Sequence, residues 1–331
     1  MSIIDDQLIK SLKTKCSKNI SFIDEIAIAL DINYDAAYRR VNGKTSISLE
    51  DAIKLSKYFN ISLNNLFNLG EKNVITITKT KEIKNALDLE NYFKNLTHDL
   101  SILNNDKSSI FYSAKDLPIF YVLQNNLLSR FKIYVWLYIL NENVPKKNIS
   151  FEKFIFPTSL TQATQKAGIA YRNVNITELW NYGIINSIVN QIFYFFETKL
   201  LSYKSALLIC NDLRKTIKEI EESAYLGKRQ NKKQTEFKLY HNELLNLNNN
   251  IIIKNKNKKT LISPYSLLRY YKIEDQYTCN AIEGFLHEQL SNSRLLSNTG
   301  LKERILFFKP IYNQIENLIK RLNLLKQFTI H

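Results

Sequence analysis

Apolar residues in the first seventy positions recur with a helical period and are separated by polar breaks. Ile4, Leu8 and Leu12 share one face of residues 3–16, which predicts a first helix. Four more short patterns follow, each opened by a residue that caps helix N-termini well. These expected caps are Ser21, Asn33, Ser48 and Ser62, and Asn42-Gly43 is expected to end the third helix. The pattern predicts a compact five-helix domain within residues 1–70.

Residues 71–331 show longer helical patterns, with boundary residues expected at 71–73. Apolar periodicity predicts helices near 127–140, 177–197 and 205–226, and again from 301, where Pro310 implies two helices or one kinked helix. Alternating or β-rich patterns predict short strands near 74–79, 109–113 and 237–262. Within the last range, apolar triplets flank a polar run, which predicts a hairpin. The expected fold class is mostly α: the five-helix domain, then a larger helical C-terminal domain with a small β-sheet or hairpin (α+β).

Composition agrees with a helical chain and adds a strong charge bias. Gly (7) and Pro (5) are scarce, which disfavours a loop-rich or all-β fold. The net charge is +15, and this favours a polyanionic partner such as nucleic acid or an anionic membrane surface. Residues 1–70 hold nine Lys or Arg and eight Asp or Glu, so the excess lies beyond Gly70. An AT-rich coding sequence, which enriches Lys, Asn and Ile, explains part of this charge equally well.

Several classes of function find no support in the sequence. The three cysteines (Cys16, Cys210 and Cys279) are far apart and form no C-x-x-C pair, so we expect reduced thiols, no metal site and no cofactor. No Gly-rich phosphate loop, H-E-x-x-H or G-x-S-x-G motif occurs, so an enzyme is not expected. The N-terminus is no signal peptide, and the apolar run 131–140 contains Lys132 and is too short to span a bilayer. We therefore expect a cytoplasmic protein without a membrane partner.

The third helical pattern, residues 34–42, has two chemically different faces. Its polar and aromatic arc holds Tyr34, Asp35, Tyr38, Arg39 and Asn42. The opposite arc holds Ala36, Ala37 and Val41, with Arg40 among them. Small residues allow this helix to pack closely on a neighbour, as the second helix of a helix-turn-helix does. The polar arc offers hydrogen-bonding groups that could read base edges in a major groove.

These residues, with the segments around them, resemble the phage-repressor type of helix-turn-helix domain, the Cro-like or XRE family, over about residues 7–68. The matching positions are Ala27 and Leu30 on the scaffold helix, Ile32 at the turn, the Gly43-Lys44 exit, the run SLEDAIKL (48–55) and NISL (60–63). Two features depart from the family pattern. Asp31 stands where the family usually has Gly, and the third helix reads AAYRRVNG, with a slightly different apolar spacing.

The resemblance implies roles for individual residues. It assigns base readout to Asn33, Tyr34, Asp35, Tyr38 and Arg39. Phosphate contacts fall to Ser21, Arg40, Asn42, Lys44, Thr45 and Ser46, at helix starts or in the exit loop. For Arg40 an internal ion pair, for instance with Asp24, is the alternative. A near-neutral domain neutralises few phosphates, so specific binding is expected to need a dimer that places two recognition helices about 34 Å apart on double-stranded DNA.

The sequence thus predicts a homodimeric, sequence-specific transcription regulator whose third helix (33–41) enters the major groove. The C-terminal domain, which loosely resembles extensions of uncharacterised regulators around FYSAKDLPIF (111–120), is expected to dimerise and is a candidate for sensing a small-molecule or protein effector. The alternative is a protein-interaction module of a phage-defence or antitoxin-like system. Two further segments carry open interpretations. His241-Asn242-Glu243 either lines a pocket or is a solvated edge, and KNKNKK (254–259) either reaches DNA or is a solvated hairpin tip.

Overall fold

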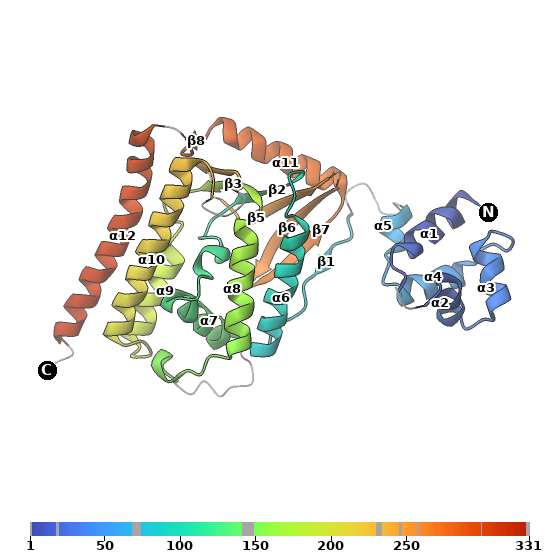
Figure 1. The fold of residues 1–331 in the computed structure, drawn as a ribbon, viewed down its shortest axis with the longest axis horizontal. Coiled ribbons are helices and arrows are strands. Elements are labelled where there is room, and N and C mark those ends of the chain that lie inside the picture. Colours follow the sequence, from blue (N-terminus) through green and yellow to red (C-terminus); the bar gives the residue numbers. More distant parts are fainter. Residues whose placement is uncertain are drawn as a thin grey trace. The chain divides into compact units, whose positions relative to one another are not determined.

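The chain forms two compact units, Met1–Ile77 and Thr78–His331, which are described separately here. The computed structural model (Figure 1) describes residues 2–17, 20–67, 74–140, 149–229, 234–244, 247–256, 258–298 and 300–328. The boundary expected at 71–73 lies outside these residues. Among the described residues, helices account for 58% and strands for 14%.

Unit 1 consists of five short helices around a small apolar core. They are α1 (Ile3–Lys13), α2 (Phe22–Leu30), α3 (Tyr34–Val41), α4 (Leu49–Tyr58) and α5 (Leu63–Phe67). Ser21, Asn33 and Ser48 each accept a hydrogen bond from the backbone N–H three residues further on, which fixes the starts of α2, α3 and α4. The core is formed by Leu8, Ile9, Leu12, Ile26, Leu30, Ala37, Leu55 and Phe59. Its members come from all of the first four helices, so these helices form one cooperative unit.

Unit 2 is built on a mixed eight-stranded sheet with the order β1-β7-β6-β5-β2-β3-β4-β8. The strands are β1 (Thr78–Lys79), β2 (Ser108–Ser113), β3 (Asn175–Trp180), β4 (Phe237–His241), β5 (Asn250–Asn255), β6 (Lys258–Ser266), β7 (Arg269–Ile273) and β8 (Arg294–Leu295). The central pairs β2–β3 and β3–β4 are parallel and the other pairs are antiparallel. Each parallel pair needs a long crossover, which the intervening helices supply.

Both faces of this sheet are covered by helices. Successive residues of β2 and β5 therefore belong in turn to two different apolar clusters. Ile110, Tyr112 and Ile253 belong to the large core shared with most helices of unit 2. Phe111 and Ile252 belong to a second cluster with Cys279 and Leu286 of α11 (Gln276–Ser291). Since both sides are buried, these strands are apolar at successive positions instead of alternating with polar residues.

The helical layer on the first face contains most helices of unit 2. Its members are α6 (Ala86–Ile102), η1 (Ile119–Val122), α7 (Leu127–Leu140), η2 (Phe151–Lys153), α8 (Thr158–Arg172), α9 (Asn186–Glu197), α10 (Tyr203–Leu226) and α12 (Leu301–Phe328). The long helices α10 and α12 pack side by side (Figure 1). Pro310 lies inside α12, which is a single helix. Gly168 of α8 meets the backbone of Leu123 so closely that a Cβ would lie 2.6 Å from its carbonyl oxygen.

The expected fold class, mostly α with a small sheet or hairpin, is wrong: the chain is an α/β fold with an eight-stranded mixed sheet. Residues 177–197 were expected to form one helix, yet β3 ends at Trp180 and α9 begins at Asn186. The apolar residues of β3, Ile176, Leu179 and Trp180, are spaced as on one face of a helix, so their pattern does not separate a short strand from a helix. Strand β7 carried no expectation at all, and β3 is held by partners far away in the sequence, in β2 and β4.

Candidate nucleic-acid interface and the buried polar network

The turn between α2 and α3 is closed by Asp31 in the left-handed conformation, with φ at +56°. Its N–H bonds to the carbonyl of Ile28, and that of Ile32 bonds to the carbonyl of Ala27. The turn therefore has the geometry that a glycine usually provides. Asp is one of the few other residue types that adopt this conformation at a small cost.

The exposures along α3 follow the two faces of its helical wheel. Ala37 is completely buried, while Ala36, Val41 and Arg40 are partly buried against the rest of unit 1. On the other face Tyr34 is 50% exposed and Tyr38 is 42% exposed, and Asp35 and Arg39 are exposed as well. Two large aromatic side chains with this much exposure on an eight-residue helix have no packing role in unit 1 that would explain them.

Contacts inside the domain leave most of the proposed base-reading groups available. Asn33 uses its side-chain oxygen to accept from the Ala36 N–H at 2.8 Å, so its amide NH₂ is the group left for a base. The Lys44 ammonium lies 5.7 Å from the centre of the Tyr38 ring. Asn42 donates its side-chain amide to the Tyr38 carbonyl at 2.9 Å, which closes the end of the helix.

The proposed phosphate contacts divide into engaged and available side chains. Arg40 donates from Nε to Asp51 at 2.8 Å and from Nη1 to the Ala36 carbonyl, so it forms an internal ion pair, with Asp51 rather than Asp24. The Ser21 hydroxyl donates to the carboxylate of Asp24, which also places a negative charge beside it. Lys44, Thr45 and Ser46 are exposed in the exit loop.

Backbone groups in the exit loop are already used. The N–H groups of Lys44 and Thr45 both donate to the carbonyl of Arg39, at 2.8 and 3.2 Å. A phosphate at this loop would therefore be held by side chains and not by a nest of free amides. The loop is fixed to the end of α3, which places Lys44 and Thr45 next to the polar face of that helix.

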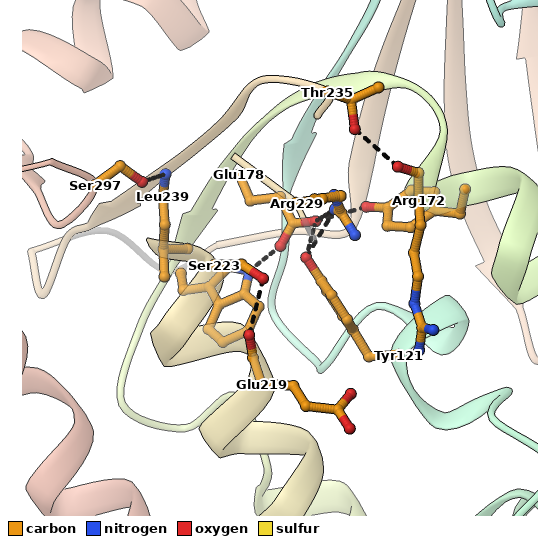
Figure 2. A network of polar contacts seen from close by, with 11 residues as sticks. Tyr121, Arg172, Glu178, Glu219, Ser223, Arg229, Thr235, Leu239 and Ser297 are labelled. Carbon is orange, nitrogen blue, oxygen red and sulfur yellow. Dashed lines mark hydrogen bonds and ion pairs between the residues drawn. The ribbon is translucent and has the colours of Figure 1, made fainter. Parts of the chain in front are cut away.

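Unit 2 contains a buried polar network that none of the sequence patterns above predicted (Figure 2). Glu178 lies on β3 between Ile176 and Trp180, on the face that meets the helices, and it is fully buried. The hydroxyls of Tyr121 and Tyr171 each donate to its Oε1 at 2.7 Å, and the Trp180 indole donates to Oε2 at 2.8 Å. Every one of these partners is a donor, which suits an ionised carboxylate.

Arg229 supplies the opposite charge. Its Nη2 lies 3.5 Å from Glu178 Oε1 and 3.0 Å from the Tyr121 hydroxyl, and the arginine is 5% exposed. The guanidinium carbon is 5.2, 4.9 and 4.9 Å from the ring centres of Tyr121, Tyr171 and Phe237. Gly227, at φ +62°, ends α10 and turns the chain toward this position.

The network joins segments that are far apart in the chain, because η1, α8, β3 and the segment after α10 each contribute a member. Its carboxylate is saturated by donors and its guanidinium is enclosed by aromatic rings. Such a network favours one arrangement of these elements over others. The sequence feature that could have indicated it is the acidic Glu178 between the apolar residues Ile176 and Leu179.

The two other segments with open interpretations also have defined surroundings. His241 and Asn242 are buried, so they are not a solvated edge, whereas Glu243 is exposed. The His241 ring lies 4.4 and 4.5 Å from the centres of Tyr182 and Phe307. Burial lowers the pKa of His241 to about 4. At the hairpin tip, Lys254 and Lys259 both form ion pairs with Glu283 of α11.

No protein-family model, no curated protein and no solved structure matches this chain. In the described ranges, no three His, Cys, Asp or Glu side chains are grouped so that they could hold a metal ion. The helices seen in those ranges are all too short or too polar to cross a membrane.

Proposed function

We propose that the chain is a cytoplasmic, sequence-specific DNA-binding transcription regulator of the Cro-like helix-turn-helix type. In this proposal α3 enters the major groove and unit 2 provides dimerisation. The observation that carries the proposal is the exposed polar face of α3, on which Tyr34, Asp35, Tyr38 and Arg39 stand over a buried Ala37. A short helix that packs through Ala37 and Val41 and presents donors, acceptors and aromatic rings outward fits base readout.

The internal contacts refine which residues take part. Arg39 forms no ion pair with any described residue, whereas its neighbour Arg40 is held by Asp51. We therefore assign base contact to Arg39, and phosphate contact to Lys44, Thr45 and Ser46. Arg40 and Ser21 are left out of the proposed phosphate contacts, because their side chains are engaged within unit 1.

Dimerisation is part of the proposal for an electrostatic reason. Residues 1–70 carry nearly balanced charge, so a single copy gains little from phosphate neutralisation. Two copies double both the base and the phosphate contacts. A dimeric mass at micromolar protein is expected; a monomer that binds its operator normally would contradict this part.

The deciding experiment is a footprint on the DNA upstream of the chain's own gene, measured over a series of salt concentrations. A duplex of the same base composition in scrambled order is the comparison. A protected site that persists at moderate salt, while the scrambled duplex is released, is the expected result. Equal affinity for both duplexes would overturn the proposal.

Adjacent arginines provide a matched pair of variants. Arg39→Ala should weaken specific binding by about 1–3 kcal/mol and relax the preference at one base position. Arg40→Ala removes the ion pair to Asp51 instead, so it should lower the stability of unit 1 by about 1 kcal/mol and leave the base preference intact. If Arg39→Ala lowered the stability of unit 1 and left the base preference intact, Arg39 would be structural.

A further inference from the structure

A cavity of about 370 Å³ lies inside unit 2, between the helical layer and the sheet. Its walls come from α6, α7 and α9 on one side and from β2, β5, β6 and β7 on the other. Most of the lining is apolar, including Leu96, Leu100, Ile110, Ile251 and Trp136. A cavity of this size and polarity lies in the range of small-molecule sites and is far larger than ordinary packing defects.

Two cationic side chains line the cavity, Arg269 and Lys132, and Arg269 forms an ion pair with Glu82. Lys132 of α7 is 7% exposed, and its ammonium donates to the Oε1 of Gln191 at 2.6 Å. Its ammonium lies 5.6 Å from the centre of the Trp136 ring. Within the described ranges, no carboxylate forms an ion pair with it. An ammonium has three donors, so a buried lysine with one amide partner retains capacity for an anion.

The burial of Lys132 has a measurable electrostatic consequence. Desolvation lowers its pKa to about 8, against a smaller opposing influence from Asp116. The side chain is therefore still mostly charged at neutral pH. A charge kept in so apolar a place is costly, and an anion bound beside it would offset that cost.

Three tyrosines add donors to the same cavity. Tyr92, Tyr112 and Tyr270 all line it, and within the described ranges their hydroxyls form no hydrogen bond. Burial raises the pKa of Tyr92 and of Tyr112, so both remain neutral phenols that can donate. The rings of Tyr92 and Tyr270 are 6.4 Å apart, which gathers two of these hydroxyl-bearing groups at one part of the wall.

The turn between β6 and β7 closes the cavity with an unusual backbone. Leu267 and Leu268 both line the cavity and pack on the large core. Leu268 has a φ of +56°, which a branched apolar residue rarely adopts. A two-residue hairpin turn requires a positive φ of this kind, and here the turn places two apolar side chains in the cavity wall.

We propose that this cavity binds a small molecule with an apolar body and one carboxylate, the carboxylate meeting Lys132 and the apolar part filling the space between α6 and the sheet. Asp99 and Asp116 are less buried than Lys132, so their charges are better solvated and do not cancel its preference. The proposal concerns ligand binding by unit 2 and does not depend on DNA binding by unit 1.

Decanoate and decan-1-ol are the probes, since they share an alkyl chain and differ in charge. Calorimetric titration of the full chain should give one decanoate per chain, bound at least tenfold more tightly than decan-1-ol. Lys132→Met should reduce decanoate affinity to that of the alcohol and leave the alcohol unchanged. Lys166→Met, at an exposed lysine of α8 outside the cavity, should change neither. Ile253→Phe, which fills part of the cavity, should weaken both probes.

Two measurements keep the proposal testable if Lys132→Met does not fold. In the wild-type chain, reductive methylation of Lys132, followed by mass spectrometry, should be slowed by decanoate and not by decan-1-ol. The exposed Lys166 serves as the internal reference. Equal binding of the two probes would overturn the carboxylate preference, and binding of neither, or methylation of Lys132 unaffected by decanoate, would overturn the site.

Discussion

The two units place their charged and aromatic groups in opposite ways. In unit 1 the side chains of Tyr34, Tyr38 and Arg39 stand outside a core of eight buried residues. In unit 2 Glu178, Arg229 and Lys132 are buried, and tyrosine hydroxyls meet them or line a cavity. The difference is what the partners proposed for each unit would require. A long polymer can be read only by groups that remain in water until it arrives. A small molecule can be recognised by groups that folding has already dehydrated.

The largest expected effect comes from breaking the buried ion pair between Glu178 and Arg229. It tests whether this pair stabilises unit 2 alone. Arg229→Met leaves the carboxylate of Glu178 buried without its cation, so unit 2 should lose about 3–5 kcal/mol of unfolding free energy. Unit 1 shares no part of this network and should keep its own transition. Scanning calorimetry of the full chain measures both transitions.

The control for this variant is a surface ion pair of the same unit. Arg214→Met removes the partner of Glu316, where the two side chains are 42% and 47% exposed, and should cost no more than about 1 kcal/mol. If Arg229→Met is as mild as Arg214→Met, the buried pair contributes little to the stability of unit 2.

A second, smaller effect is a loss of the folding stability of unit 2 at acidic pH. His241 is buried beside Tyr182 and Phe307, and the nearby charges are Glu243 and Arg294. Its folded-state pKa of about 4 lies below the unfolded value of 6.5, so the unfolded chain binds the proton first. Stability from this residue is complete above pH 6.5 and is lost as the pH falls toward 4, by about 1–2 kcal/mol at pH 5.

His241→Phe removes that titration and keeps a ring of similar size. Urea unfolding of both proteins at pH 7 and pH 5 should show a smaller acid loss for the variant. All carboxylates are common to the two proteins, so they cancel in the comparison. An equal loss in both would mean that His241 is protonated in the folded chain as easily as in the unfolded one.

The smallest expected effect lies in unit 1. Asp31→Gly places a glycine at φ +56° and should raise the stability of unit 1 by about 0.5 kcal/mol, as the strain relieved slightly exceeds the entropy gained by the unfolded chain. Asp35→Gly, inside α3, should lower it, because a helical position gains nothing from glycine. The melting temperature of unit 1 within the full chain gives both signs. If both variants shifted the melting temperature in the same direction, the positive φ at position 31 would not be what determines the effect of glycine.

How far the fold could be predicted differs between the units for the same reason. Helix starts in unit 1 depend on contacts within three or four residues, so Ser21, Asn33 and Ser48 could be identified as caps from their neighbours alone. Strand β3 has its partners in β2 and β4, which whole helices separate from it along the chain. This segment was therefore taken for the start of a helix.

The candidate sites show the same division. The polar face of α3 follows from a helical period, and Arg40 is the informative exception, because its partner Asp51 lies on the next helix rather than at Asp24. Lys132 was visible as a charge within an apolar run, but nothing in that run indicated a cavity. His241 and Asn242 appeared as an isolated polar cluster, and burial by Phe307 of α12 could not be foreseen.

The sequence by itself determined the short capped helices of unit 1 and the two faces of α3. Only the tertiary structure decided that unit 2 is an α/β fold, that Glu178 and Arg229 meet, and that Lys132 faces a cavity. The physical reason is the range of the interactions. Capping and helical amphipathicity act between neighbours along the chain, whereas strand pairing and the burial of charge depend on which distant segments come together.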